Sequence, residues 1–252
     1  MRTPRFLGMA CLLLWGCACP LWGEAAAPAA PADLLARADA QYEKRADPAA
    51  AALAVDLYQK TVATVPGNYT AWWHLARACW WLGDHVPREK RLSIFDLGKA
   101  AGEKAVALQP QGRDGHYWLG VCLGRISEER GVLNGLFLVG PIAEQMEAVL
   151  AINPRDAEAM HVLSILYRKA PGWPLSRGDL QKSLALAREA VALRPDLVNT
   201  HVGLALALLA LNGKAEAKKE LQLALTLPEP PEYQPETADD KQEAKTLLGQ
   251  LP

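Results

Sequence analysis

Apolar side chains recur along most of the chain at spacings of three and four residues, which place them on one face of an α-helix. This helical pattern precedes each of four prolines, Pro66, Pro110, Pro154 and Pro195, which stand at intervals of 44, 44 and 41 residues. Proline lacks the backbone N–H that a helix interior requires, so each of these residues is expected to follow the end of a helix. The regular interval therefore predicts a repeated helical unit.

A second pattern starts six residues after each proline and has a large residue, a leucine, a small residue and a further large or apolar residue at fixed offsets. Its copies are Trp72, Leu75, Ala76 and Cys79; His116, Leu119, Gly120 and Leu123; Met160, Leu163, Ser164 and Tyr167; and His201, Leu204, Ala205 and Leu208. They resemble the first helix of tetratricopeptide repeats. We therefore expect an all-α, right-handed superhelical solenoid of about five tetratricopeptide-like helix pairs over residues 32–228. A capping helix within residues 229–252, with Thr237 near its start, is expected to close it.

The second, third and fourth pairs exceed the usual length of roughly 34 residues by about ten, ten and seven residues. We expect the additional residues to form loops between the two helices of each pair, at 84–90, 130–141 and 170–174. Leu133, Leu136 and Phe137 in the second insertion are too apolar to stand free in water, so they are expected to pack back on the array or to meet a partner.

The first residues have the features of an export signal. Arg2 and Arg5 precede an apolar run, and we expect a signal peptide over residues 1–23 and an Ala/Pro tether over 24–31. The residues that end at Cys17 resemble a lipobox, which predicts a periplasmic protein anchored by a lipid on Cys17. Cleavage after a small-residue site near Gly23 would instead leave a soluble periplasmic protein. No later apolar run of membrane-spanning length is expected.

The composition argues against several classes of function. The formal net charge of −1 and the lack of a basic stretch argue against a nucleic-acid partner. Beyond the leader only Cys79 and Cys122 remain, and we expect both to be small core residues. The histidines near the repeat positions are explained by the repeat itself. We recognise no metal, cofactor or catalytic motif, so the chain is predicted not to be an enzyme.

The first helix of each pair is expected to line the concave face of the superhelix. The residues next to the repeat positions then form an aromatic wall with a few cations, which suits an apolar or amphipathic ligand with an acidic end. Trp72 is assigned to the core instead, and the arginines could alternatively be solvated. The candidate ligand- or partner-binding residues are Trp73, Arg77, Trp80, Trp81, Tyr117, Trp118, Val121, Arg125, His161, Ile165 and Arg168.

Three segments resemble the tetratricopeptide T-component proteins of TRAP transporters: residues 115–120, 130–142 and 228–243. The resemblance implies a periplasmic homotrimer, often lipid-anchored, that partners a TRAP solute-binding protein and holds a hydrophobic cavity for its ligand. This favours a binding accessory of a periplasmic uptake system. The alternatives are a cell-envelope scaffold that docks peptides or partner proteins, and a structural lipoprotein without a specific ligand.

Overall fold

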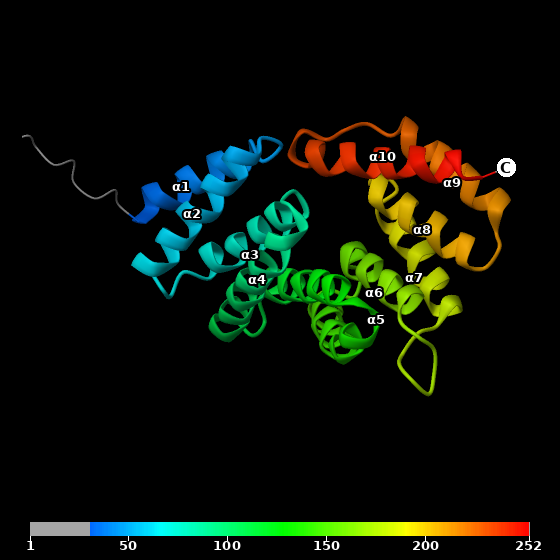
Figure 1. Cartoon of the computed structure of the whole chain (residues 1–252), viewed down its shortest axis with the longest axis horizontal. Helices are drawn as coiled ribbons and strands as arrows, with labels where there is room; N and C mark the ends of the chain where they lie inside the picture. Colours follow the sequence, from blue (N-terminus) through cyan, green and yellow to red (C-terminus); the bar gives the residue numbers. More distant parts are fainter. Residues whose placement is uncertain (1–30, 252) are drawn as a thin grey trace, which may run out of the picture.

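The computed structural model describes residues 31–251, which form ten α-helices, one 3₁₀ turn and no β-strand. Helices that follow one another in the sequence contact each other (Figure 1), which confirms the predicted helical-repeat fold class. The predicted signal peptide, Cys17 and residues 24–30 lie outside the described residues. The elements are α1 (Pro31–Tyr42), α2 (Pro48–Thr64), α3 (Tyr69–Asp84), α4 (Arg88–Leu108), α5 (Arg113–Ile152), α6 (Ala157–Lys169), α7 (Leu180–Leu193), α8 (Val198–Ala210), α9 (Lys214–Thr226), η1 (Pro231–Tyr233) and α10 (Gln234–Gly249).

The helix α5 contains both helices of the third pair. Its backbone leaves the helical conformation at Gly131, where φ is 74° and ψ is 172°. A positive φ is unfavourable for residues with a Cβ, so glycine is the residue that fits this joint. The third pair therefore consists of residues 113–130 and 132–152, joined by a one-residue break.

Two of the three predicted insertion loops are wrong. The additional residues of the second pair lengthen α4, which begins at Arg88 and leaves only a short turn after α3. Those of the third pair lengthen both halves of α5. Continuing a helix satisfies one backbone hydrogen bond per added residue, whereas a long loop would leave these groups to be paired elsewhere. Only the third insertion forms a loop, between Lys169 and Leu180.

At the first position of the repeat pattern, Trp72, His116 and His201 each make the same kind of hydrogen bond. Trp72 Nε1 donates to the carbonyl oxygen of Pro66 at 2.7 Å. His116 Nε2 donates in the same way to Pro110 at 2.9 Å, and His201 Nε2 donates to Pro195 at 3.0 Å. These bonds pair a carbonyl just past the end of one helix with the start of the next helix. His116 and His201 therefore hold the turns between repeats, as the repeat register predicted.

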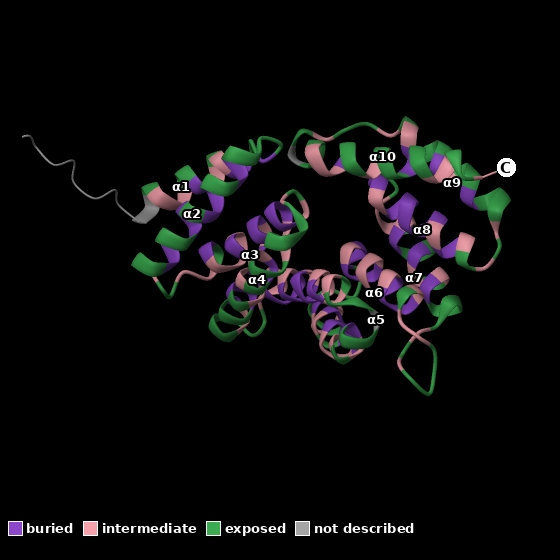
Figure 2. Ribbon diagram, viewed as in Figure 1, coloured by how far each residue is buried: buried purple, intermediate pink, exposed green. Residues whose placement is uncertain are grey.

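Small residues allow the helices to pack closely, and the buried positions face one another between neighbouring helices (Figure 2). A Cβ added to Gly102 of α4 would lie 2.9 Å from Cα of Leu119 in α5. Cys79 and Cys122 are both buried free thiols, as predicted for small core residues.

The helix α10 does more than cap the array, and it begins at Gln234 rather than near Thr237. Its second half packs Ala244, with Leu247 and Leu248, against the apolar cluster of α8 and α9. Its first half lies near the turn between α1 and α2, because the segment after α9 runs back toward these helices before α10 starts (Figure 1). Arg45, in the turn after α1, donates through Nε to Glu236 at 2.7 Å. Contacts with α10 thus join the first repeat to the last.

A second correction concerns the segment Leu133–Ile152. Within residues 31–251, it alone is both long and apolar enough to cross a membrane, by length and composition alone. The sequence pattern did not predict such a run after the leader. Its residues Val139, Ile142 and Met146 are buried in one core cluster with Leu163 and Tyr167 of α6. Part of the apolar character of this segment is therefore used for packing inside the array.

Candidate functional site

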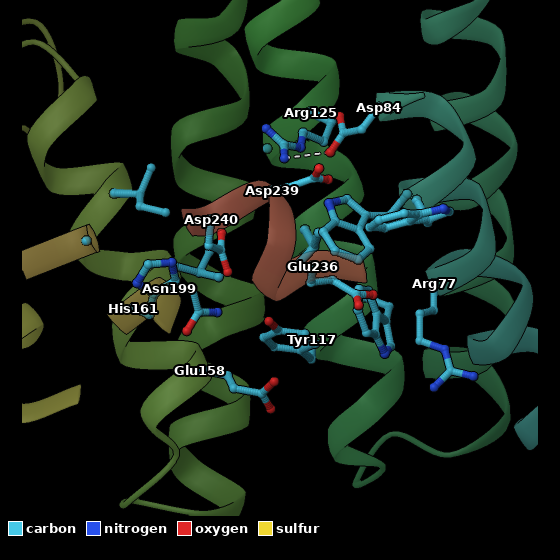
Figure 3. Close-up of a pocket in the computed structure, with 18 of the residues that line it drawn as sticks. Arg77, Asp84, Tyr117, Arg125, Glu158, His161, Asn199, Glu236, Asp239 and Asp240 are labelled. Atoms are coloured by element: carbon cyan, nitrogen blue, oxygen red, sulfur yellow. Dashed lines mark ion pairs between the residues drawn. The ribbon is translucent and has the colours of Figure 1, made fainter. Parts of the chain in front are cut away.

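A cavity of about 610 Å³ lies on the concave side of the array. Helices α3, α5, α6 and α8 form its walls, and α10 crosses one side of it (Figure 3). All eleven side chains that the sequence selected line this one cavity, although they come from three different helices. Their role in binding stays a prediction.

Aromatic rings form one wall of the cavity. The ring centroids of Trp80 and Trp118 are 5.3 Å apart, and the ring of Tyr117 meets Trp118 edge-on at 5.0 Å. Trp81 is only 3% exposed, its Nε1 donates to the carbonyl of Arg45 at 2.7 Å, and it stacks on His85. Trp81 therefore supports the wall, while the half-buried Trp73, Trp80 and Trp118 are available to a ligand.

Arg125 is paired with carboxylates of the same chain, and its side chain is 36% exposed. It forms an ion pair with Asp84 at 2.6 Å (Figure 3) and another with Glu128 at 2.9 Å. Burial raises the pKa of Asp84 above its ordinary value, and the Arg125 charge opposes this shift. Burial also favours the neutral form of Glu128, but Arg125 and Lys169 outweigh that effect and hold the Glu128 pKa below its ordinary value. The network fixes the position of the guanidinium at the wall.

Two other arginines are less completely paired. The guanidinium of Arg77 lies over the rings of Tyr42 and Trp73, 4.1 and 5.1 Å from their centroids, and its buried Nε has no hydrogen-bond partner within residues 31–251. Arg168 forms no ion pair within 4.0 Å among the described residues. Burial lowers its pKa, while Glu243 and Glu128 act in the opposite direction from a longer distance. Arg168 is therefore desolvated without a carboxylate within ion-pair distance, whereas Arg77 lies near the hydroxyl of Tyr58 and within the influence of the Asp39 charge.

The α6 and α8 side of the cavity holds buried polar atoms. The imidazole of His161 packs by its Nδ1 side on Gly203, where an added Cβ would come within 2.6 Å of that nitrogen. Within the described chain, His161 Nδ1 and Asn199 Oδ1 have no hydrogen-bond partner. Burial, aided by the Arg168 charge, lowers the pKa of His161 to about 4, so its ring is neutral at physiological pH. His161 and Asn199 therefore offer neutral polar atoms on this side, next to the charged Glu158 and Arg168 of α6.

The family becomes clear from a comparison with known proteins. The model of the family described as "Regulator of microtubule dynamics protein 1-3" matches residues 34–169, which is more than half of the chain. The chain belongs to this family. The matched segment of this regulator of microtubule dynamics family covers α1 to α6 almost completely and contains all eleven selected side chains. The helices α8 and α10, which complete the cavity, follow the matched segment.

Solved structures show the same fold. A tetratricopeptide protein of Thermus thermophilus, TTC0263, has a TM-score of 0.65 and is 18% identical, with 88% of this chain and 98% of that chain covered. The MamA protein has a TM-score of 0.51 and is 16% identical, with 84% of this chain and 94% of that chain covered. No curated protein sequence matches. These comparisons confirm a tetratricopeptide-like fold and give no support to the resemblance to TRAP T-component proteins, which stays a hypothesis.

Sequence reasoning missed the acidic side of the cavity in this family member. Four carboxylates of α10 line it: Glu236, Asp239, Asp240 and Glu243. Asp239 and Asp240 point into the same space as Arg125 and His161 (Figure 3). Burial, together with the neighbouring carboxylates, raises the pKa of Asp240 to about 7. The spacing of three, four and seven residues, which puts all four on one helix face, could have indicated them.

A smaller hollow of about 300 Å³ adjoins the cavity and shares Ile165 and Val162 with it. Leu136 and Val139 line this hollow, so part of the apolar run in the third pair packs back as predicted. Leu133 and Phe137 do not pack back on the array, since they are 80% and 82% exposed, so for them only the alternative of a partner remains open. These two lie four residues apart on the helix, so they share an outward face that the array does not cover.

Proposed function

We propose that this protein is a non-catalytic helical-repeat scaffold that binds a segment of a partner protein in its concave cavity. The observation that carries the proposal is the cavity of about 610 Å³, with the half-buried rings of Trp73, Trp80 and Trp118 on one side. On the other side are buried polar atoms that have no hydrogen-bond partner in the part of the chain that the structure describes. Aromatic residues in desolvated pockets contribute strongly to protein recognition. Unpartnered polar groups favour a ligand that supplies hydrogen bonds to them.

A peptide array followed by titration in solution tests the proposal. Peptides that bind the wild-type chain should quench or shift its tryptophan fluorescence in a saturable manner. The Trp118→Ala variant should weaken that binding at least tenfold. Trp173→Ala is the matched control, because Trp173 is 90% exposed and lies outside the cavity lining. Binding that both variants reduce equally, or that neither reduces, would place the partner elsewhere.

The same cavity also suits a second candidate, an apolar or amphipathic acidic small molecule. The specific observation in its favour is the desolvated Arg168, which no carboxylate of the described chain approaches within 4.0 Å. For this candidate, the protein is a periplasmic accessory of a TRAP-type uptake system and binds the solute-binding protein of that system. It does so as a homotrimer, which is the oligomeric state that the resemblance implies. Native mass spectrometry of protein purified without detergent tests for a retained ligand and for a trimer. A ligand-free monomer that captures no solute-binding protein would exclude this candidate.

Export and a lipid anchor are part of this second candidate and need their own test. Metabolic labelling with a fatty acid should mark the wild-type protein and leave a Cys17→Ala variant unmarked. Fractionation should place the wild-type chain with the envelope. Recovery of unlabelled wild-type protein in the cytosol would contradict both proposals about its location.

A further inference from the structure

The helix α10 is joined to the rest of the molecule in two different ways. Its second half is held by apolar packing of Ala244, Leu247 and Leu248 against α8 and α9. Its first half is held mainly by polar contacts with elements of the first two repeats. These are the bidentate pairing of Glu236 with Arg45 and the pairing of Asp239 with His85 Nε2 at 3.1 Å. The first half can therefore separate without exposing the apolar contacts of the second half.

Two of the four cavity-facing carboxylates of α10 pair with basic groups of the concave face, and the other two lie within the longer-range influence of an arginine. Glu236 pairs with Arg45, and Asp239 pairs with His85. At longer range, the charge of Arg125 acts on Asp240 and the charge of Glu243 acts on Arg168. The concave face thus already holds an acidic helix that belongs to the same chain, and that helix indicates what the face recognises.

The fit of α10 is incomplete. Asp240 is buried beside the carboxylates of Glu243, Asp239 and Glu236, and burial, followed by these neighbouring charges, raises its pKa to about 7. Arg168 lies beyond ion-pair distance of Glu243 in the described chain. Most of the aromatic wall also faces the remaining cavity space rather than an apolar side chain of α10. A helix with better placed carboxylates and an apolar face would satisfy these groups more fully.

We infer that the concave cavity accepts an acidic amphipathic helix of a partner protein in the place of the first half of α10, which acts as a built-in competitor. This inference rests on the proposed function and names its partner class. The partner helix presents carboxylates three, four and seven residues apart to the basic groups, and apolar side chains to Trp80 and Trp118. Because α10 is tethered, it competes at a high effective concentration. The partner's apparent affinity is its intrinsic affinity multiplied by the fraction of molecules in which the first half of α10 is undocked.

The test uses a fluorescein-labelled peptide copy of residues 234–249 and a neutral peptide in which its four cavity-facing carboxylates are replaced by amides. Fluorescence anisotropy is measured with the full wild-type chain and with the Glu236→Gln/Asp239→Asn variant, which weakens the docking of α10. The acidic peptide should bind this variant at least tenfold more tightly than it binds the wild type. The neutral peptide should bind neither chain. Glu103→Gln/Glu216→Gln, two exposed substitutions outside the cavity, is the matched control and should behave as the wild type.

A second variant covers the case in which the double substitution disturbs folding. Ten Gly and Ser residues inserted after Pro228 keep every side chain of α10 but lower its effective concentration, so they should increase the affinity for the acidic peptide severalfold. Equal binding of the acidic and neutral peptides, or no gain in either opened variant, would overturn the inference. If array peptides without acidic residues still bind in a Trp118-dependent manner, the proposed function survives that result. If no peptide binds the wild type or an opened variant, both fail.

Discussion

At the residue scale, the cavity contains side chains whose pKa values differ from their ordinary values. Burial holds His161 neutral, and burial together with neighbouring carboxylates raises the pKa of Asp240 to about 7. The candidate residues on α3, α5 and α6 could be selected from the sequence because they stand next to recognisable repeat positions. Their electrostatic partners Asp84 and Glu128 could not, since they reach the cavity through tertiary packing that no local pattern records. For Asp240, the spacing of the α10 carboxylates indicates a shared helix face but not the surface that this face meets.

The Asp240 pKa predicts a pH dependence of stability. Below about pH 4 the carboxyl group is protonated in both the folded and the unfolded chain, so it has no effect. Between the ordinary value of 3.8 and about 7, the folded state retains a proton that the unfolded state has lost, so stability falls as the pH rises through this window. Asp240→Asn should leave Tm unchanged near pH 4 and raise it by about 2–6 °C at pH 8. Thermal denaturation at both pH values measures this, and an equal shift at both would contradict it.

The His161 pKa of about 4 gives a second prediction at this scale. The imidazole should stay neutral from pH 8 to pH 5.5, while a solvated histidine titrates within that range. Histidine ring NMR spectra, assigned with a His161→Gln variant, measure this directly. A His161 signal with a midpoint near 6.5 would show that the α6 and α8 side of the cavity is open to water.

At the scale of elements, the sequence predicted the helices well and the connections poorly. The turns after Pro66, Pro110 and Pro195 were predictable because each repeats one ring-to-carbonyl hydrogen bond. The extension of α4 and the joint at Gly131 were not predictable from the sequence. Inserted residues that lengthen a helix differ only weakly in composition from inserted residues that form a loop. The close approach of α4 and α5 at Gly102 was also not predictable, because it depends on which residue of the neighbouring helix packs against Gly102.

Gly102 and Gly124 form a matched pair for testing helix packing. Gly102→Ala would place a Cβ 2.9 Å from Cα of Leu119, so we expect a loss of about 1–3 kcal/mol in the free energy of unfolding. A Cβ at Gly124 meets nothing within 4 Å, and Ala favours the helix, so Gly124→Ala should be neutral or stabilise by up to about 1 kcal/mol. Urea denaturation of both variants measures these changes in the free energy of unfolding. Equal changes would show that α4 and α5 are not in close contact.

At the scale of the whole molecule, α10 connects two ends that lie far apart in the sequence. Arg45 and Glu236 are separated by 191 residues, and no periodicity of either segment predicts that they meet. The repeat pattern alone predicts an open superhelix with a cap at one end. The observed contacts close it and divide the concave face into a part that α10 covers and a part that remains open.

A double-mutant cycle tests that connection. Arg45 is 5% exposed and Glu236 18% exposed, and they pair through two hydrogen bonds. Arg45→Ala and Glu236→Ala should each destabilise the chain, and the double variant should lose less than the sum. The expected coupling is about 1–3 kcal/mol in the free energy of unfolding, measured with urea. Additive losses would show that the two side chains do not interact in solution.

Hydrogen–deuterium exchange of residues 234–243, with and without a saturating acidic amphipathic helical peptide, tests most directly whether the concave face is a docking site that α10 occupies. We predict that the free protein protects these amides and that the peptide increases their exchange, while residues 244–249 stay protected against α8 and α9. Bound peptide with unchanged or stronger protection of residues 234–243 would contradict the account.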